Sequence, residues 1–178
     1  MATYFSNQFA AAGTDVAAFD SAYRASQGAV GGHVRYEIAR ASTTATAAND
    51  TIRMFRGLHS STRLFSLTAQ VASTPSQGVI DIGLHLSGFN HDGAVVDIDV
   101  FEDGQSITSG LAETDVFLGA SLTALDRGKT LWEIAAEGAA SYTEDPNVLF
   151  DITVSTPTAI ITASATEIML VAGFLLTD

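Results

Sequence analysis

From residue 33 onward, the main pattern of this chain is the alternation of apolar and polar positions. Runs such as Arg63 to Val71 and Val79 to Leu86 carry an apolar side chain at every second position, which is the period of a half-buried β-strand. Short groups of Gly, Pro, Ser and Asn separate the runs. This pattern predicts an all-β fold, a jelly-roll-like antiparallel β-sandwich of about eight strands with one or two short helices.

The predicted strands can be placed by their alternation. They are, in chain order, Val34 to Arg40, Thr51 to Phe55, Arg63 to Val71, Val79 to Leu86, Ala94 to Phe101, Leu149 to Val154 and Ala165 to Leu176, with a short extra piece at 159–162. In the fifth of these strands we expect Val96, Ile98 and Val100 to face the core. Asp97 and Asp99 would then lie on the solvent face.

One helix is indicated between the last strands. Thr130 is a plausible N-cap, Glu133 stands three residues later as in a capping box, and Gly138 would end the helix. The preceding segment, 115–125, fits either a strand through Val116 or a helix carrying Leu118 and Leu122 on one face.

Residues 1–32 differ from the rest and divide the chain into an N-terminal arm and a β-sandwich domain over 33–178. A short helix from Asp15 to Arg24, capped by Thr14, is consistent with their pattern. The segment is either a frayed terminus or an arm that docks on a neighbouring subunit, because scattered aromatic side chains favour a covering surface. The candidate interface residues are the aromatics Tyr4, Phe5, Phe9, Phe19 and Tyr23, together with the single tryptophan, Trp132.

Charge and composition narrow the range of functions. The chain has 20 acidic and 8 basic residues, for a net charge of −12, and such a surface repels phosphate backbones, so no direct nucleic-acid binding is expected. It contains no cysteine, which excludes disulfides and thiolate chemistry. No apolar run is long enough for a membrane span, and the N-terminus does not resemble a secretion signal.

Few residues suggest chemistry. His85 and His91 precede Asp97 and Asp99, so a metal cluster is conceivable, but alternating aspartates are typical of the solvent face of a strand, which is the interpretation we favour. No serine lies in a Gly-x-Ser-x-Gly turn, and the one lysine, Lys129, is not in a phosphate-binding loop. We therefore expect no enzyme activity, no cofactor and no metal.

Two sequence blocks resemble a family of tailed-phage head proteins. The first runs from Gly31-Gly32-His33-Val34-Arg35 to the Asp50-Thr51-Ile52 strand, and the second contains Leu131-Trp132-Glu133, Asp145-Pro146 and Phe150-Asp151-Ile152. In order and spacing they are similar to head decoration, or cement, proteins and other minor virion proteins. The resemblance covers roughly residues 30–176 and does not extend to the N-terminal 28 residues.

The resemblance implies a non-enzymatic homotrimer on the capsid surface of a virion, with the major capsid protein as its partner. Two other functions remain as alternatives. A carbohydrate- or receptor-binding jelly-roll module would use the loop Phe89-Asn90-His91-Asp92. A cupin-like metalloenzyme would need histidines at tight spacing on adjacent strands, which His85 and His91 do not supply.

Overall fold

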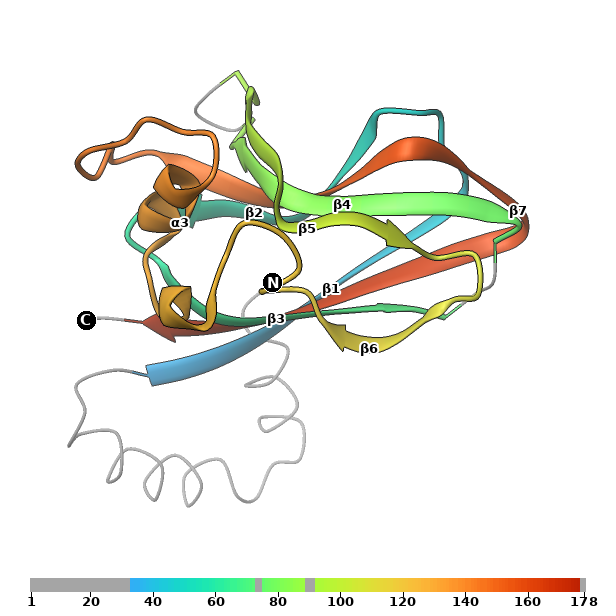
Figure 1. Ribbon diagram of the computed structural model, residues 1–178, viewed down its shortest axis with the longest axis horizontal. Coiled ribbons are helices and arrows are strands. Elements are labelled where there is room, and N and C mark those ends of the chain that lie inside the picture. The colour runs from blue at the N-terminus through green and yellow to red at the C-terminus, as the bar shows by residue number, and fades with distance from the viewer. Residues whose placement is uncertain (1–32, 73–74, 89–91, 177–178) are drawn as a thin grey trace, which may run out of the picture.

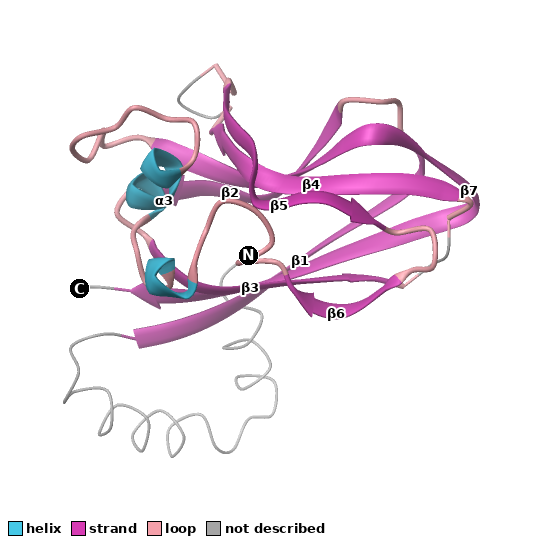
Figure 2. Ribbon diagram, viewed as in Figure 1, coloured by secondary structure: helices cyan, strands magenta, loops and turns pink. Residues whose placement is uncertain are grey.

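The computed structural model describes residues 33–72, 75–88 and 92–176, and within these ranges strands dominate (Figures 1 and 2). The strands are β1 (His33–Ala45), β2 (Asp50–His59), β3 (Arg63–Val71), β4 (Gln77–Leu86), β5 (Val95–Ser106), β6 (Leu111–Asp115) and β7 (Leu149–Leu176). The helical elements of the described part are the 3-10 turn η1 (Ala124–Asp126) and the helix α3 (Leu131–Glu137). Figure 2 shows both at one end of the strands.

The strand β7 belongs to two sheets. Its first half pairs with β2 on one side and β4 on the other, and β5 extends that sheet beyond β4. Its second half pairs with β1 and β3, and β6 extends that sheet beyond β3. In Figure 1, β7 runs along one layer, bends, and returns in the other. The result is two four-stranded antiparallel sheets, so the prediction of an all-β sandwich is confirmed.

The core fills the space between the two sheets. Ile82 and Ile152 from one sheet and Leu67 and Leu170 from the other are fully buried. A pair of aromatic rings also joins the layers, because Phe55 on β2 and Phe174 on β7 meet edge to face with centroids 5.9 Å apart. Burial of such side chains contributes about 1.5–3 kcal/mol each relative to exposure.

The helix α3 forms as its capping residues predict. Thr130 is the N-cap, and its backbone N–H and hydroxyl both donate to Glu133 Oε2, at 2.8 and 2.7 Å. Gly138 is the C-cap. The segment 115–125, which the sequence left open between strand and helix, is mostly turns and bends that connect β6, ending at Asp115, to η1, beginning at Ala124. None of the helices in the described ranges has the length and apolar character needed to cross a bilayer.

The end of the chain departs from the predicted two strands with a short piece between them. Residues from Leu149 to Leu176 form one strand of 28 residues. A strand can serve two layers if it bends where it leaves one sheet for the other, and here the β1 register also shifts at that bend, between Thr43 and Ala45. The described part of the chain therefore has seven strands.

The predicted facing of β5 is wrong for Asp97. Its side chain is only 7% exposed, whereas Val95 is 61% and Ile98 39% exposed. The cause is a bulge. Ile82 on β4 lies opposite Glu102 on β5, and Leu84 lies opposite Asp97, so an advance of two residues along β4 corresponds to five residues along β5. Extra residues reverse the alternation of a strand.

The strand β1 presents its apolar face to the outside. Arg35, Glu37 and Ala39 lie opposite Phe174, Ala172 and Leu170, which face the core. The intervening residues Val34, Tyr36 and Ile38 are therefore on the outer face of the sheet. The alternation predicted a strand here correctly. The apolar side chains of Val34, Tyr36 and Ile38, however, point away from the core.

Candidate functional site

An ion pair between β2 and β7 is the most buried charged group in the described part of the molecule. The carboxylate of Asp151 is fully buried. Its Oδ2 accepts a hydrogen bond from Nη1 of Arg53 at 2.6 Å, and its Oδ1 accepts one from the backbone N–H of Gly57 at 2.8 Å. Both oxygens of the buried carboxylate thus have a donor, which is the condition for keeping a charge inside a protein.

Arg53 extends this ion pair to the loop after β4. Nη1 also donates to the carbonyl of Leu86 at 3.1 Å, and Nη2 donates to that of Gly93 at 3.0 Å. Gly93 has φ of +75°, and a Cβ there would lie 2.7 Å from Nη2. Arg53 therefore ties two ends of this loop to the sheet, which is a structural role.

His85 lies beside the ion pair on β4. The ring is 3% exposed, and its Nδ1 lies 2.9 Å from the hydroxyl of Thr153. Burial, followed by the nearby charge of Arg53, lowers the pKa of His85. The neutral form of His85 is therefore favoured at pH 7. Its ring packs beside the ion pair and contacts the hydroxyl of Thr153.

A second cluster, along β4 and β5, is made of acidic side chains. Asp97 accepts hydrogen bonds from the backbone N–H groups of Ala139 and Asp99, at 2.7 and 3.2 Å. Asp81 accepts one from the backbone N–H of Gly104 at 2.8 Å. We call this group the β5 carboxylate cluster, and its members are Asp81, Asp97, Asp99, Glu102 and Asp103.

The members of the β5 carboxylate cluster repel one another. The pKa of Asp99 is raised to about 6, first by its hydrogen bond with Asp97, then by burial and by the surrounding carboxylates. Burial and the charge of Asp103 also raise the pKa of Glu102. Mutual repulsion of this kind favours the protonated form of a carboxyl group.

The described members of the metal cluster considered in the sequence analysis are not brought together. The charged groups that act on His85 are Arg53 and Asp151, not Asp97 or Asp99. Across residues 33–72, 75–88 and 92–176, no three His, Asp or Glu side chains are arranged to hold a metal ion. His91 lies outside the described residues.

Other acidic residues fasten loops. Asp126 forms an ion pair with Lys129 at 2.6 Å and accepts hydrogen bonds from Thr123, and these contacts, that with Lys129 first, lower its pKa to about 2. Asp145 accepts a hydrogen bond from the hydroxyl of Ser60 at 2.5 Å. Burial alone would raise the pKa of Asp145, but the bonds from Ser60 and Asn147 together lower it.

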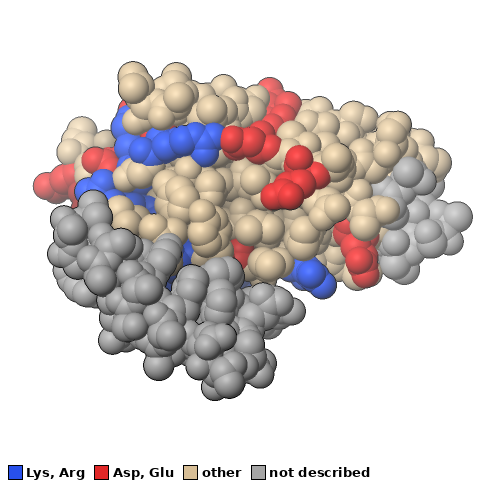
Figure 3. All heavy atoms as spheres, turned by 90° about the horizontal axis from the view of Figure 1, so that it is seen from below, with Lys and Arg blue, Asp and Glu red and all other residues tan. Residues whose placement is uncertain are grey.

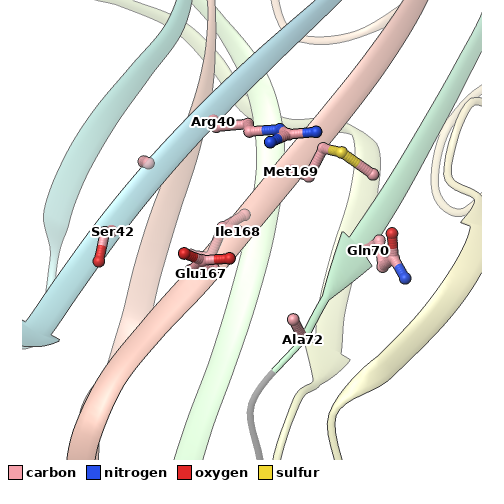
Figure 4. A pocket seen from close by; sticks show the side chains of 8 residues that line it. Arg40, Ser42, Gln70, Ala72, Glu167, Ile168 and Met169 are labelled. Atoms are coloured by element: carbon pink, nitrogen blue, oxygen red, sulfur yellow. The ribbon is translucent and has the colours of Figure 1, made fainter.

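Among the described residues, a shallow groove lies on each side of β1. One, of about 330 Å³, lies on the outer face between β1, β7 and β3, and in Figure 4 Arg40 reaches from β1 toward Met169 on β7. The other, of about 340 Å³, lies between β1 and β2 and is lined by Glu37, Arg40 and Arg56. In Figure 3, Lys and Arg atoms gather toward one end of the visible face.

The candidate interface residues are divided by the structure. Tyr4, Phe5, Phe9, Phe19 and Tyr23 lie outside the described residues. Trp132 is on α3, where it is partly buried and packs against the core. The arm and the interface assignment therefore remain predictions.

The sequence analysis missed the Arg53–Asp151 pair and the burial of His85. A signal for the first was present, because Asp151 interrupts the apolar run from Leu149 to Val154. An acid that is buried at such a position needs a counter-charge or hydrogen-bond donors. Which residue supplies them depends on which strands become neighbours, and that information is not local.

Comparison with known proteins gives a weak similarity to a solved structure. No protein-family model matches the chain, and no curated protein matches it in sequence. Among solved structures, a chain of the "Cyanophage Pam1 capsid asymmetric unit" is similar with a TM-score of 0.43 and 13% identity, over 82% of this chain and 86% of that one. The fold assignment above depends on the strand pairing of the chain itself.

Proposed function

We propose that this protein is a structural component of a phage virion, which decorates the capsid exterior and stabilises it as a non-enzymatic cement. One observation carries the proposal: the two sequence blocks that resemble phage head proteins meet in the fold. Arg53 follows Asp50-Thr51-Ile52 of the first block, and it binds Asp151, the central residue of Phe150-Asp151-Ile152 in the second. The motifs that carry the resemblance thus specify one buried contact.

Other motif residues support the same interpretation. Glu133 of Leu131-Trp132-Glu133 closes the N-terminus of α3, and Asp145 of Asp145-Pro146 binds Ser60 at the end of β2. These residues stabilise the scaffold. A resemblance concentrated in scaffold contacts favours a shared architecture, which is what a structural component of a shell needs.

In this proposal the partners are further copies of the chain, as a homotrimer, and the major capsid protein. The net charge of −12 favours a basic surface on the capsid protein, and salt would weaken that attraction while apolar contacts persisted. Residues 1–32 would act as an arm that contacts a neighbouring subunit. Removing residues 1–28 should then leave the fold intact and weaken attachment to the shell, whereas unfolding of the shortened chain would contradict the domain division.

The test is heat-induced DNA release from particles with and without the protein. Cement acts through many modest contacts repeated by symmetry, so its removal should lower the temperature of genome release without preventing assembly. Sedimentation of the isolated protein tests the trimer separately. Equal release curves, with the protein shown to be present in one sample and absent from the other, would contradict the stabilising role and favour a glycan- or receptor-binding surface.

A further inference from the structure

The outer face of the sheet formed by β1, β7 and β3 contains the groove of about 330 Å³ that Figure 4 shows. Two adjacent rows of side chains form it, each written in the order β1, β7, β3: Arg40, Met169 and Gln70, then Ser42, Glu167 and Ala72. The side chains at the two ends of the first row are long, and those at the two ends of the second row are short. The groove follows from this difference in length along the strands.

The polar side chains of this groove are accessible to a ligand. Arg40, Ser42 and Glu167 are exposed, and Gln70 is half-buried. In the part of the chain that the structure describes, none of these four side chains forms a hydrogen bond or an ion pair. A bound molecule could therefore use all four without breaking a contact within the protein.

Arg40 and Glu167 are opposite charges that lie close together and remain unpaired. They are diagonal neighbours on adjacent strands, because Glu167 is two residues from Met169, which lies opposite Arg40. Diagonal neighbours are about 7–8 Å apart, which is within the reach of long side chains. Three other arginines of the described part do pair with a carboxylate. The groove is thus lined by a cationic donor and an anionic acceptor that do not satisfy each other.

We propose that this groove binds a neutral oligosaccharide. Each sugar hydroxyl both donates and accepts hydrogen bonds, so hydroxyls can accept from the guanidinium of Arg40 and donate to the carboxylate of Glu167. The side chains of Gln70 and Ser42 also do both, and they can bind the remaining hydroxyls. Hydrogen bonds to ionised groups are the stronger kind, so Arg40 and Glu167 should contribute most to affinity. The C–H groups of the sugar ring would lie against Met169, as the apolar part of a ligand does in a site with a few polar groups.

Other ligands match the groove less well. The net charge of −12 repels acidic sugars and phosphates. An amino-acid zwitterion could pair with Arg40 and Glu167, but water screens exposed ion pairs, and Gln70 would be left without a partner. The volume of the groove is near the lower limit of small-molecule sites, which is about 300 Å³. Such a volume suits a few sugar rings and not a folded protein.

This site goes beyond the proposed function and does not depend on it. A capsid protein can stabilise a shell through one surface and bind a sugar through another. The two proposals also fail separately, because sugar binding is measured on the isolated chain and capsid stabilisation on whole particles. An absence of sugar binding would overturn the site and leave the predicted change in genome release as it is.

The experiment adds neutral trisaccharides of glucose, mannose and N-acetylglucosamine in turn to the full chain, and records NMR spectra of its methionine methyl groups and glutamine side-chain amides. We expect at least one trisaccharide to shift the Met169 methyl and the Gln70 amide in a saturable way at millimolar concentration. Met54, which lies on β2, is the internal reference and should not shift. Arg40→Ala and Glu167→Ala should each weaken binding by at least about tenfold, the usual effect of losing a hydrogen bond to a charged group.

A matched variant completes the test. Glu113→Ala removes an exposed carboxylate from β6, outside the groove, and should bind like wild type. No saturable shift at Met169 with any of the trisaccharides would overturn the proposal, and so would unchanged affinity of Arg40→Ala and Glu167→Ala. A response to glycine in place of the sugars would overturn it in favour of a zwitterion site. If a variant failed to fold, the shifts of the wild-type chain would still decide, because they report on the groove without any substitution.

Discussion

Two charged clusters lie on the same sheet, and they handle burial in opposite ways. Beside β2, the carboxylate of Asp151 faces the guanidinium of Arg53. Along β5, Asp97 and Asp81 receive backbone N–H groups, and their nearest charges are other carboxylates. The difference shows that a buried carboxylate in this sheet can be matched either by a cation or by backbone N–H donors.

Removing the cation should have the largest effect. Arg53→Met leaves the buried Asp151 without its counter-charge, and loss of one partner of a buried ion pair costs about 3–5 kcal/mol. At about 2–4 °C per kcal/mol, we expect the Tm to fall by roughly 10 °C. Urea and thermal unfolding measure the loss. The double variant Arg53→Met/Asp151→Asn should recover much of it, and a double variant as unstable as the single one would contradict the charge explanation.

Filling the space between β4 and β5 should have the next largest effect. A Cβ at Gly83 would lie 2.1 Å from the carbonyl oxygen of Asp97, so Gly83→Ala must push the β5 bulge away from β4. Overpacking of this kind costs about 1–3 kcal/mol. Gly88→Ala, where no atom lies within 4 Å of the added carbon, is the matched control. Equal melting temperatures for the two variants would show that the bulge is not held by close contact.

The two predictions above depend on features that the sequence reveals to different degrees. Local signals are sufficient for β3, which was predicted from Arg63 to Val71 and lies there, and for α3, whose cap residues are adjacent in sequence. The facing of Asp97 could not be predicted, because the bulge is a relation between β5 and β4. The same holds for Arg53 and Asp151, which are 98 positions apart.

The change in stability with pH that the β5 carboxylate cluster causes should be smaller than the effects above. Its sign should be opposite to that of an ordinary ion pair. The pKa of Asp99 is raised to about 6 in the folded state, above its usual value of 3.8. Between these values the folded state binds more protons than the unfolded state, so this group's contribution to stability falls as pH rises toward 6 and stays low above it.

Asp99→Asn removes this dependence. Because Asp99 is partly solvated, screening reduces the effect, and we expect the variant to exceed wild type in Tm by about 2–4 °C at pH 7.5. The difference in Tm between the variant and wild type should shrink at pH 5, where Asp99 of the wild type is protonated. Comparing the variant with wild type at each pH cancels the opposing contribution of His85, whose lowered pKa makes acid destabilising. A constant difference across this range would argue against a shared proton.

The smallest expected effect is that of a chelator. A cation bound among the β5 carboxylates would contribute to folding stability, and its removal would lower the Tm by several degrees. We expect no change, because backbone amides already donate to both oxygens of Asp97 and to Oδ1 of Asp81. Addition of Ca²⁺ to the chelated protein provides the reverse measurement, and a rise in Tm would assign this cluster a cation after all.

The length of β7 also has a consequence for biosynthesis. Its two halves are the central strand of both sheets, and β1 pairs with it from His33↔Leu176 inward. While the ribosome is still adding residues 149–176, the six earlier strands have been made but lack the strand that joins them. Folding must therefore await late translation, and contacts between residues so distant in sequence form slowly. A chain that stops early would expose unpaired strands and become a substrate for chaperones and proteases.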